Sequence, residues 1–396
     1  MPRFLPFAGL RYDPARVELA DVIAPPYDVI GPDEQAHLAA HSPYNAVHVE
    51  LGRADAGRDV YASAGCRFDD WLAENVLVAD PEPGFYAYRM GFHDDQGVAR
   101  QTTGVIGALE LSVPGEGDVR PHERTMGKPK DDRLNLLRAC RANLSPVWCL
   151  SLARGLADLC QPAGPPVARA TDDAGVHHRL WRITSRGVLD AIEELVASAP
   201  AVIADGHHRY ETALAYRDER RAVTGGAGGD AELLMTLMVE LNEEQLDVRP
   251  IHRLVAGLAD GFDLIGALSE FFEVRPSGPD IDDLPRRMAS ERALGLVLPD
   301  GTWLLHPRNP DADQPDSALL ERALAALPTP VVDFHHAPDA VAKAVASGEA
   351  QAGVLLRPVA MHHIGAAAAA GRRMPEKTTF FHPKPRTGMV FRRIAD

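Results

Sequence analysis

The feature that most constrains the fold is a polar segment, Ala204–Arg209, that directly follows the apolar run Ala201–Ile203. The residues after it, Tyr210–Arg217, have helix-forming composition. An apolar run, a glycine and a helical segment together predict a strand that turns at Gly206 into a helix. Such a helix presents free backbone N–H groups and the positive end of its dipole, so the sequence predicts an anion-binding site there.

The side chains of this segment support the same interpretation. His207, His208 and Arg209 add positive charge and hydrogen-bond donors, and a guanidinium can bind two phosphate oxygens at once. Asp205 can hold a metal ion or orient an imidazole. We interpret the segment as phosphate-handling, with a metal site and a polar helix cap as the alternatives. The chain has neither a G-x-x-x-x-G-K-[ST] run nor a Rossmann glycine fingerprint.

A second motif, His122-Glu123, lies before a charged helical segment, Met126–Arg141, with Thr125 as a candidate helix cap. A carboxylate at a helix entrance can act as a general base that takes a proton from a substrate hydroxyl. The alternative is a solvated surface acid. The pair does not begin a zincin motif, because Met126 stands where the second histidine would be required.

Two further segments are candidate binding loops. Near the C-terminus, Lys377 and the adjacent hydroxyls of Thr378 and Thr379 can hold a phosphate or a carboxylate; the alternative is a basic, turn-rich tail. Near the N-terminus, two consecutive prolines follow an apolar run that is predicted to be the end of a strand. Tyr27 and Asp28 then project from a stiff loop and are candidate substrate contacts, the alternative being a purely architectural turn.

The motifs around Glu123, Asp205 and Lys377, in this order, resemble those of the archaeal ADP-dependent free serine kinases, which belong to the ParB/sulfiredoxin-like superfamily. Over its whole length the chain resembles the family called domain-of-unknown-function 1015. That family opens with segments like Pro6–Arg11 and Ala24–Ile30.

The kinase resemblance implies that Glu123, with His122 beside it, deprotonates an acceptor hydroxyl, while Lys377, Thr378 and Thr379 close on the substrate side. It further implies a nucleotide-phosphate site made of Asp205, Gly206, His207, His208 and Arg209. The expected reaction is phosphoryl transfer from ATP or ADP, with Mg²⁺, to a small hydroxylated metabolite, free L-serine favoured. A non-catalytic nucleotide sensor and a metal-dependent phosphohydrolase are the alternatives. Neither the metal ligands nor the oligomeric state is predicted.

Composition limits the partners of this chain. Its net charge of -15 argues against a general nucleic-acid surface. No apolar run approaches the roughly 20 residues that a membrane helix needs, and the N-terminus lacks the apolar core of a signal peptide. The four cysteines show no C-x-x-C spacing and are predicted to be free thiols. We therefore expect a cytoplasmic protein without nucleic-acid or membrane partners.

The pattern of apolar residues predicts an α/β fold, an α+β mixture in which a ParB/sulfiredoxin-like core is flanked by two further α/β regions. The expected regions are residues 1–115, 116–258, which hold the phosphate-binding core, and 259–396, which close the site. Residues 45–51 are predicted to be a strand, and residues 231–241 a buried helix, although 236–241 are equally compatible with a strand.

Overall fold

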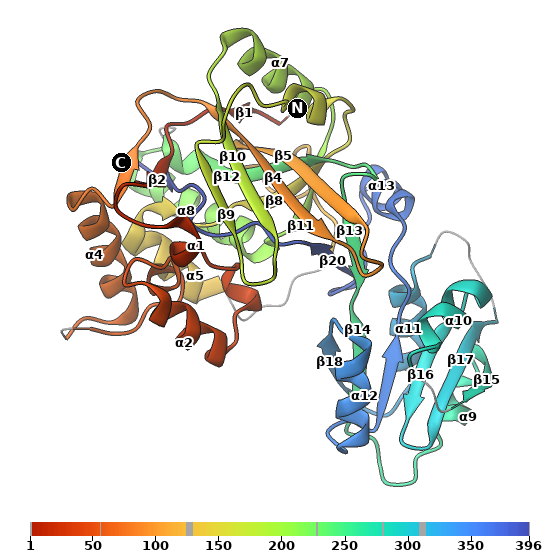
Figure 1. Cartoon of the computed structure of the whole chain (residues 1–396). Coiled ribbons are helices and arrows are strands. Elements are labelled where there is room, and N and C mark those ends of the chain that lie inside the picture. Colours follow the sequence, from red (N-terminus) through yellow and green to blue (C-terminus); the bar gives the residue numbers. More distant parts are fainter. Residues whose placement is uncertain are drawn as a thin grey trace. The chain divides into compact units, whose positions relative to one another are not determined.

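The computed structural model describes residues 2–55, 57–123, 130–226, 229–278, 281–308 and 314–395. The chain divides into two compact units (Figure 1). Unit 1 comprises Met1–Pro121, Thr125–Leu246 and Pro383–Asp396, and unit 2 comprises His122–Arg124 and Asp247–His382. The predicted boundary at residue 115 falls inside unit 1, because the strands before and after it share one sheet. The expected mixed α/β class is confirmed.

Unit 1 holds most of the strands. They are β1 Phe4–Leu5, β2 Leu10–Tyr12, β3 Leu77–Ala79, β4 Phe85–His93, β5 Ala99–Glu110, β6 Val119–Pro121, β7 Ala142–Asn143, β8 Val147–Ser151, β9 Ala168–Thr171, β10 His177–Ile183, β11 Ala201–Asp205, β12 Leu233–Glu240 and β21 Arg392–Arg393. Its helices are α1 Leu19–Val22, α2 Pro32–His41, α3 Val47–Glu50, α4 Val60–Ala73, α5 Lys130–Cys140, α6 Leu156–Leu159, α7 Arg186–Ala197 and α8 His207–Thr224, with two 3₁₀ turns, η1 Tyr27–Val29 and η2 Asp230–Glu232.

A mixed sheet organises unit 1. Its described strands run in the order β6-β11-β8-β12-β5-β4-β10-β9, and β1 pairs with β5. The pairs β6–β11 and β8–β12 are parallel, and the others are antiparallel. On one face, side chains of β5, β8 and β11 pack against α7 and α8 in a single apolar core. A second core joins α4 and α5 to the chain's N-terminal segments and to Phe391. Figure 1 shows α2, α4 and α5 gathered beside the sheet.

Unit 2 is an antiparallel sheet with helices on both faces. Its described elements are β13 Asp247–Pro250, β14 His252–Ala256, β15 Phe272–Gly278, β16 Leu294–Leu298, β17 Gly301–Pro307, β18 Val331–His335, β19 Ala352–Leu355, β20 Thr379–His382, α9 Leu264–Leu268, α10 Leu284–Glu291, α11 Asp316–Ala325, α12 Pro338–Ala346 and α13 Met361–Ala369. The strand order is β15-β17-β16-β19-β14-β18, while β13 pairs separately with β20. Helices α9 and α11 pack on one face of the larger sheet, and α10 and α12 on the other.

The strand, glycine turn and helix predicted around Gly206 are confirmed as β11 and α8. Three other predictions are wrong. Residues 45–51 contain α3, because the Asn45 side chain accepts from the Val47 N–H and donates to the carbonyls of Asp21 and Ile23, which starts a helical turn. The apolar run before the two prolines ends helix α1 and not a strand.

The predicted helix over 231–241 is the third error, since Leu233–Glu240 form β12, in line with the strand alternative given for residues 236–241. This strand lies between β5 and β8 and is buried over almost its whole length. A strand covered on both faces has no polar–apolar alternation, so its sequence pattern is that of a buried helix as well. The four cysteines are free thiols, as predicted.

Gly104 in β5 gives a direct test of the packing of this sheet. A Cβ atom there would lie 2.7 Å from the Met238 carbonyl oxygen and 2.7 Å from a methyl carbon of Val239. We expect Gly104→Ala to lower the free energy of unfolding, measured by urea denaturation, by about 2 kcal/mol. Gly91→Ala on neighbouring β4 is the control, because its nearest atom would be 3.8 Å away. Equal effects of the two substitutions would contradict this packing.

Candidate functional site

The end of β11 and the start of α8 form the centre of the candidate site in unit 1. Gly206, between them, has φ +88°, a backbone conformation that favours glycine. A Cβ atom there would also lie within 3.0 Å of the Arg209 guanidinium. Glycine is therefore required both for the turn and for the close approach of Arg209. Gly206 is the N-cap residue of α8, and His207 and His208 in the first turn of this helix are half-buried.

Asp205 lies between two cationic side chains of unit 1. Arg209 donates from Nη2 to one carboxylate oxygen over 2.7 Å, and the Lys384 ammonium binds the other. Burial alone would raise the pKa of Asp205, but Lys384 and Arg209 outweigh it and hold this pKa well below its usual range. Two cationic side chains and the carboxylate between them thus lie beside the N-terminus of α8. This arrangement is suited to an anion such as a phosphate.

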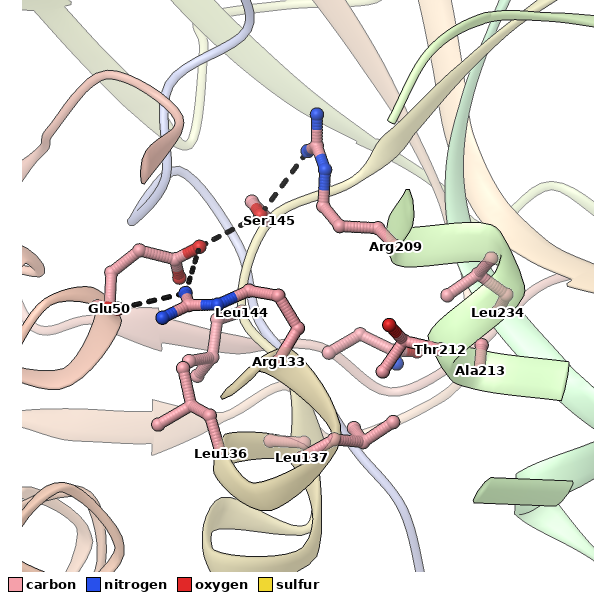
Figure 2. A pocket seen from close by; sticks show the side chains of 12 residues that line it. Glu50, Arg133, Leu136, Leu137, Leu144, Ser145, Arg209, Thr212, Ala213 and Leu234 are labelled. Atoms are coloured by element: carbon pink, nitrogen blue, oxygen red, sulfur yellow. Dashed lines mark hydrogen bonds and ion pairs between the residues drawn. The ribbon is translucent and has the colours of Figure 1, made fainter. Parts of the chain in front are cut away.

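A small cavity adjoins Arg209 (Figure 2). Its volume is about 60 Å³. It is lined by Glu50, Arg133, Leu136, Leu137, Ala142, Asn143, Leu144, Ser145, Arg209, Thr212, Ala213 and Leu234. Half of these residues are apolar, while Glu50, Arg133, Ser145 and Arg209 form a polar cluster that Figure 2 shows linked by hydrogen bonds and ion pairs.

The polar cluster in the cavity is incompletely paired. Arg133 Nη1 lies 3.7 Å from Glu50 Oε1 and donates to the Glu50 carbonyl oxygen over 2.9 Å. Arg209 Nη1 donates to Ser145 Oγ over 3.3 Å. Glu50 Oε2, Arg209 Nε and Thr212 Oγ1 are buried without a hydrogen-bond partner among the described residues. Because an unpaired buried polar atom costs free energy, these three residues are candidate contacts for a small polar ligand.

Tyr27 and Asp28, in the turn η1, belong to the same region of unit 1. The Arg133 guanidinium lies 4.3 Å from the centre of the Tyr27 ring, and burial raises the pKa of Tyr27 to about 12. Burial would lower the pKa of Arg209, but the charges of Asp205 and then Asp28 contribute to raising it. The structure thus brings the predicted N-terminal contacts into the electrostatic neighbourhood of Arg209.

Glu123 lies in unit 2, where its carboxylate binds the predicted C-terminal loop. The backbone N–H groups of Lys377, Thr378 and Thr379 donate to it over 3.1, 3.2 and 2.9 Å, and the Thr379 hydroxyl donates over 2.8 Å. Lys377 has φ +53°, which turns these N–H groups toward one acceptor. Four donors on a largely buried carboxylate make Glu123 an anchor of this loop.

Side chains next to Glu123 and in the loop add further hydrogen bonds to this part of unit 2. His122 is buried, with Nε2 2.8 Å from Thr379 Oγ1 and 3.2 Å from Glu123 Oε1. The Thr378 hydroxyl donates to the Pro375 carbonyl oxygen over 2.7 Å and lies 2.9 Å from Ser317 Oγ. In this state both threonine hydroxyls bind protein atoms. Thr125, the predicted helix cap, lies outside the described residues.

The structure therefore places the predicted residues in two groups. Unit 1 unites Tyr27, Asp28 and Asp205–Arg209, and unit 2 unites His122, Glu123 and Lys377–Thr379. Sequence reasoning missed Glu50 and Ser145. Glu50 lies in a segment wrongly predicted as a strand, and no motif surrounds Ser145.

The residues at hand do not form a Mg²⁺ site around Asp205, because both of its carboxylate oxygens bind cationic side chains.

The stability of unit 1 should depend on the ionisation of Asp205. Its folded-state pKa lies below its unfolded-state value, so the stabilisation is complete above about pH 4 and is lost as the pH falls toward the folded-state pKa. We expect Asp205→Asn to lower the free energy of unfolding by about 3 kcal/mol at neutral pH. This difference from wild type should shrink below about pH 4.

Urea denaturation at a series of pH values measures this effect, with the exposed Asp70→Asn as control. A penalty for Asp205→Asn that does not change with pH would contradict the ion-pair assignment.

Comparison with solved structures gives distant matches. Free serine kinase in complex with AMP is 11% identical, with a TM-score of 0.40, covering 70% of this chain and 88% of that chain. A variant of free serine kinase in complex with ADP is 10% identical, with a TM-score of 0.40. The match covers 70% of this chain and 89% of that chain. SbnI with a C-terminal truncation, from Staphylococcus aureus, is 12% identical, with a TM-score of 0.37. The match covers 72% of this chain and 86% of that chain. Likeness at this level does not establish a shared activity.

The search of curated proteins found no match. In the stretches that the structure describes, no helix combines the length and the apolar character needed to cross a membrane. The family model described as "Protein of unknown function (DUF1015)" matches residues 4–332, which is most of the chain. The chain therefore belongs to the DUF1015 family.

Proposed function

We propose that this protein is a small-molecule kinase that transfers a phosphoryl group from ATP or ADP to the hydroxyl of a metabolite, with free L-serine as the favoured acceptor. The observation that carries the proposal is the pair of cationic side chains at the start of α8, where Asp205 lies between Arg209 and Lys384. Phosphoryl transfer depends mainly on positioning and on neutralising phosphate charge, and this site supplies both.

The donor phosphates are proposed to bind at the turn around Gly206. The first backbone N–H groups of α8 lie at the positive end of the helix dipole, directly after the turn at Gly206, where such groups are suited to donate to phosphate oxygens. Arg209 supplies a guanidinium held in place by Asp205 and by the Pro146 carbonyl oxygen, 2.7 Å away. His207 and His208 add donors in the first turn. Mg²⁺ is proposed to arrive bound to the nucleotide, since Asp205 offers it no oxygen.

The acceptor is proposed to bind in the cavity beside Arg209. Glu50 Oε2 can accept from an ammonium, Arg209 Nε can donate to a carboxylate, and the Thr212 hydroxyl can pair with either. These unpaired atoms suit a small zwitterion. A free amino acid with a short hydroxylated side chain meets this condition.

Glu123 is proposed as the general base. Its carboxylate is held by N–H and O–H donors from Lys377–Thr379, and such donors favour the ionised form that a base needs. Proton transfer to Glu123 requires one carboxylate oxygen to exchange a loop donor for the substrate hydroxyl. The same set of hydrogen bonds favours a second candidate, a nucleotide sensor in which Glu123 is a permanent anchor and no transfer occurs.

Phosphorus NMR of the protein with Mg²⁺, L-serine and either ADP or ATP tests the kinase directly. We expect a new phosphomonoester signal with wild type and none with Glu123→Gln, which should change ADP affinity by no more than about twofold because the base acts in the transition state. Glu376→Gln, in the same loop, is the control and should retain transfer.

Three outcomes would contradict parts of this proposal. Nucleotide that binds without turnover on any hydroxylated metabolite would favour the sensor. Free phosphate without a new ester would favour a phosphohydrolase. Equal loss of transfer and of ADP binding in Glu123→Gln would contradict the general-base role.

The acceptor pocket makes a separate prediction. Glu50→Gln keeps the size of the side chain but removes its negative charge, so it should raise the KM for L-serine by about tenfold and leave kcat within about twofold. Steady-state kinetics measures both, with the exposed Glu82→Gln as control. An unchanged KM in a folded Glu50→Gln protein would show that the acceptor binds elsewhere.

A further inference from the structure

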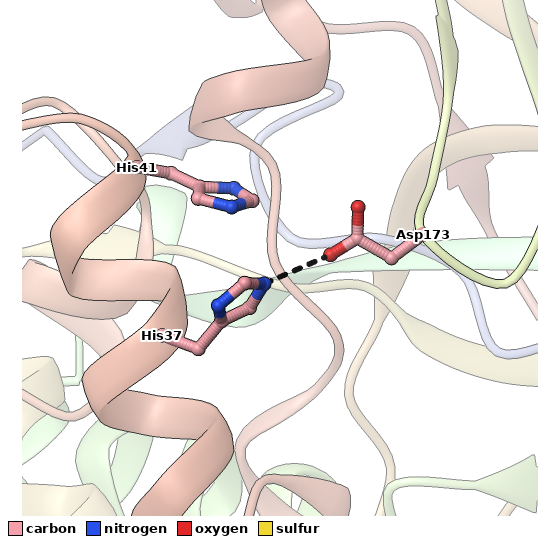
Figure 3. A group of neighbouring side chains, drawn as sticks. All are labelled: His37, His41 and Asp173. Atoms are coloured by element: carbon pink, nitrogen blue, oxygen red, sulfur yellow. Dashed lines mark ion pairs between the residues drawn. The ribbon is translucent and has the colours of Figure 1, made fainter.

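A group of three exposed side chains in unit 1 lies apart from the candidate site (Figure 3). His37 and His41 stand one turn apart on α2, and Asp173 lies in the turn between β9 and β10. One nitrogen of each imidazole and one oxygen of the carboxylate lie within 4.8 Å of one another. In the part of the chain that the structure describes, no other group of three histidine, cysteine or acidic side chains meets this distance.

The two imidazole rings and the Asp173 carboxylate lie close to one another. His37 Nε2 lies 3.6 Å from Asp173 Oδ2, and the two imidazole rings have centroids 4.4 Å apart. Figure 3 shows both rings on the side of α2 that faces Asp173. A simple surface ion pair needs only one histidine and the acid. The second imidazole beside the first is better explained by a ligand that accepts lone pairs from all three groups.

The turn that carries Asp173 is held in place by its neighbour. Asp172 Oδ1 accepts from the N–H groups of Ala174 and Val176 over 3.0 and 2.9 Å. Its other oxygen, Oδ2, binds His178 Nε2 over 2.9 Å, and the Arg386 guanidinium also binds it. The backbone of the turn next to Asp173 is thus held by the contacts of Asp172.

The helix that carries the histidines is also fixed. Pro32 occupies its first turn, Leu38 is buried, and Gln35 Nε2 donates to the Leu51 carbonyl oxygen. A spacing of four residues places His37 and His41 on the same face of the helix. Two rigid elements therefore present the ligands, which lowers the cost of ordering them around an ion.

We propose that His37, His41 and Asp173 form a binding site for a divalent transition-metal ion of the zinc class, in which water completes the coordination. Two imidazole nitrogens and one carboxylate oxygen are typical zinc ligands. Imidazole suits Zn²⁺, Co²⁺ and Ni²⁺, whereas Mg²⁺ and Ca²⁺ prefer sites made only of oxygen. This site is independent of the proposed kinase, and its bound ion would join α2 to the β9–β10 turn.

Titration of the apoprotein with Co²⁺ at about pH 7.5, followed by visible absorption and calorimetry, tests the site. We expect one ion per chain with a micromolar Kd, and at least about tenfold weaker binding in each of His37→Ala, His41→Ala and Asp173→Asn. All three residues are exposed, so the variants should fold, which circular dichroism checks. His93→Ala removes an exposed histidine at the end of β4 and is the control.

Saturating Zn²⁺ should also raise the melting temperature of wild type but not of Asp173→Asn, because an ion that binds only the folded state stabilises it. Unchanged Co²⁺ affinity in Asp173→Asn would overturn the proposal and leave only a surface histidine pair. Equal weakening by His93→Ala, or no binding below millimolar concentrations, would overturn it as well. None of these readouts depends on phosphoryl transfer.

Discussion

The ion pairs of Asp205 are the interaction on which the rest of unit 1 depends most. Arg209, one turn into α8, and Lys384, in the returning C-terminal segment, bind the two oxygens of one buried carboxylate. Neither cation could be buried there without the anion, because an unpaired charge in this environment costs several kcal/mol. The acid thus fixes both the start of α8 and the path of the C-terminal segment.

The C-terminal segment is joined to unit 1 along its length. Thr387 pairs with Ala24, and Phe391 pairs with Leu10, in isolated β-bridges. The Arg392 guanidinium donates to Asn143 Oδ1 and to the Leu233 carbonyl oxygen over 3.2 and 3.0 Å. Residues from the two ends of the chain therefore share one core, and Lys384 reaches Asp205 on a backbone that is already ordered.

Local patterns predicted β11, Gly206 and α8, because an apolar run, a glycine with positive φ and a helical segment each leave a signal within a few residues. Other parts depend on contacts between distant residues and left no such signal. Strand β12 is covered on both faces, and α3 depends on hydrogen bonds from Asn45 to a segment more than twenty residues earlier. The same holds for the cavity, where Glu50, Ser145 and Thr212 meet only after folding.

Glu123 shows how a predicted motif can have more than one physical role. The sequence predicts a general base, and the structure shows a carboxylate that organises Lys377–Thr379 through four hydrogen bonds. The two roles are compatible if the loop gives up one donor when a substrate hydroxyl arrives. A loop held by the proposed general base would then respond to the presence of substrate.

The central claim is that the cationic cluster at the start of α8 binds nucleotide phosphates. Calorimetric titration of ADP into wild type and into Arg209→Gln, each shown to be folded, tests it most directly. The account predicts saturable binding to wild type and at least about tenfold weaker binding to Arg209→Gln, because a buried guanidinium–phosphate contact is lost. Equal ADP affinity in the two proteins, or no ADP binding to wild type, would contradict it.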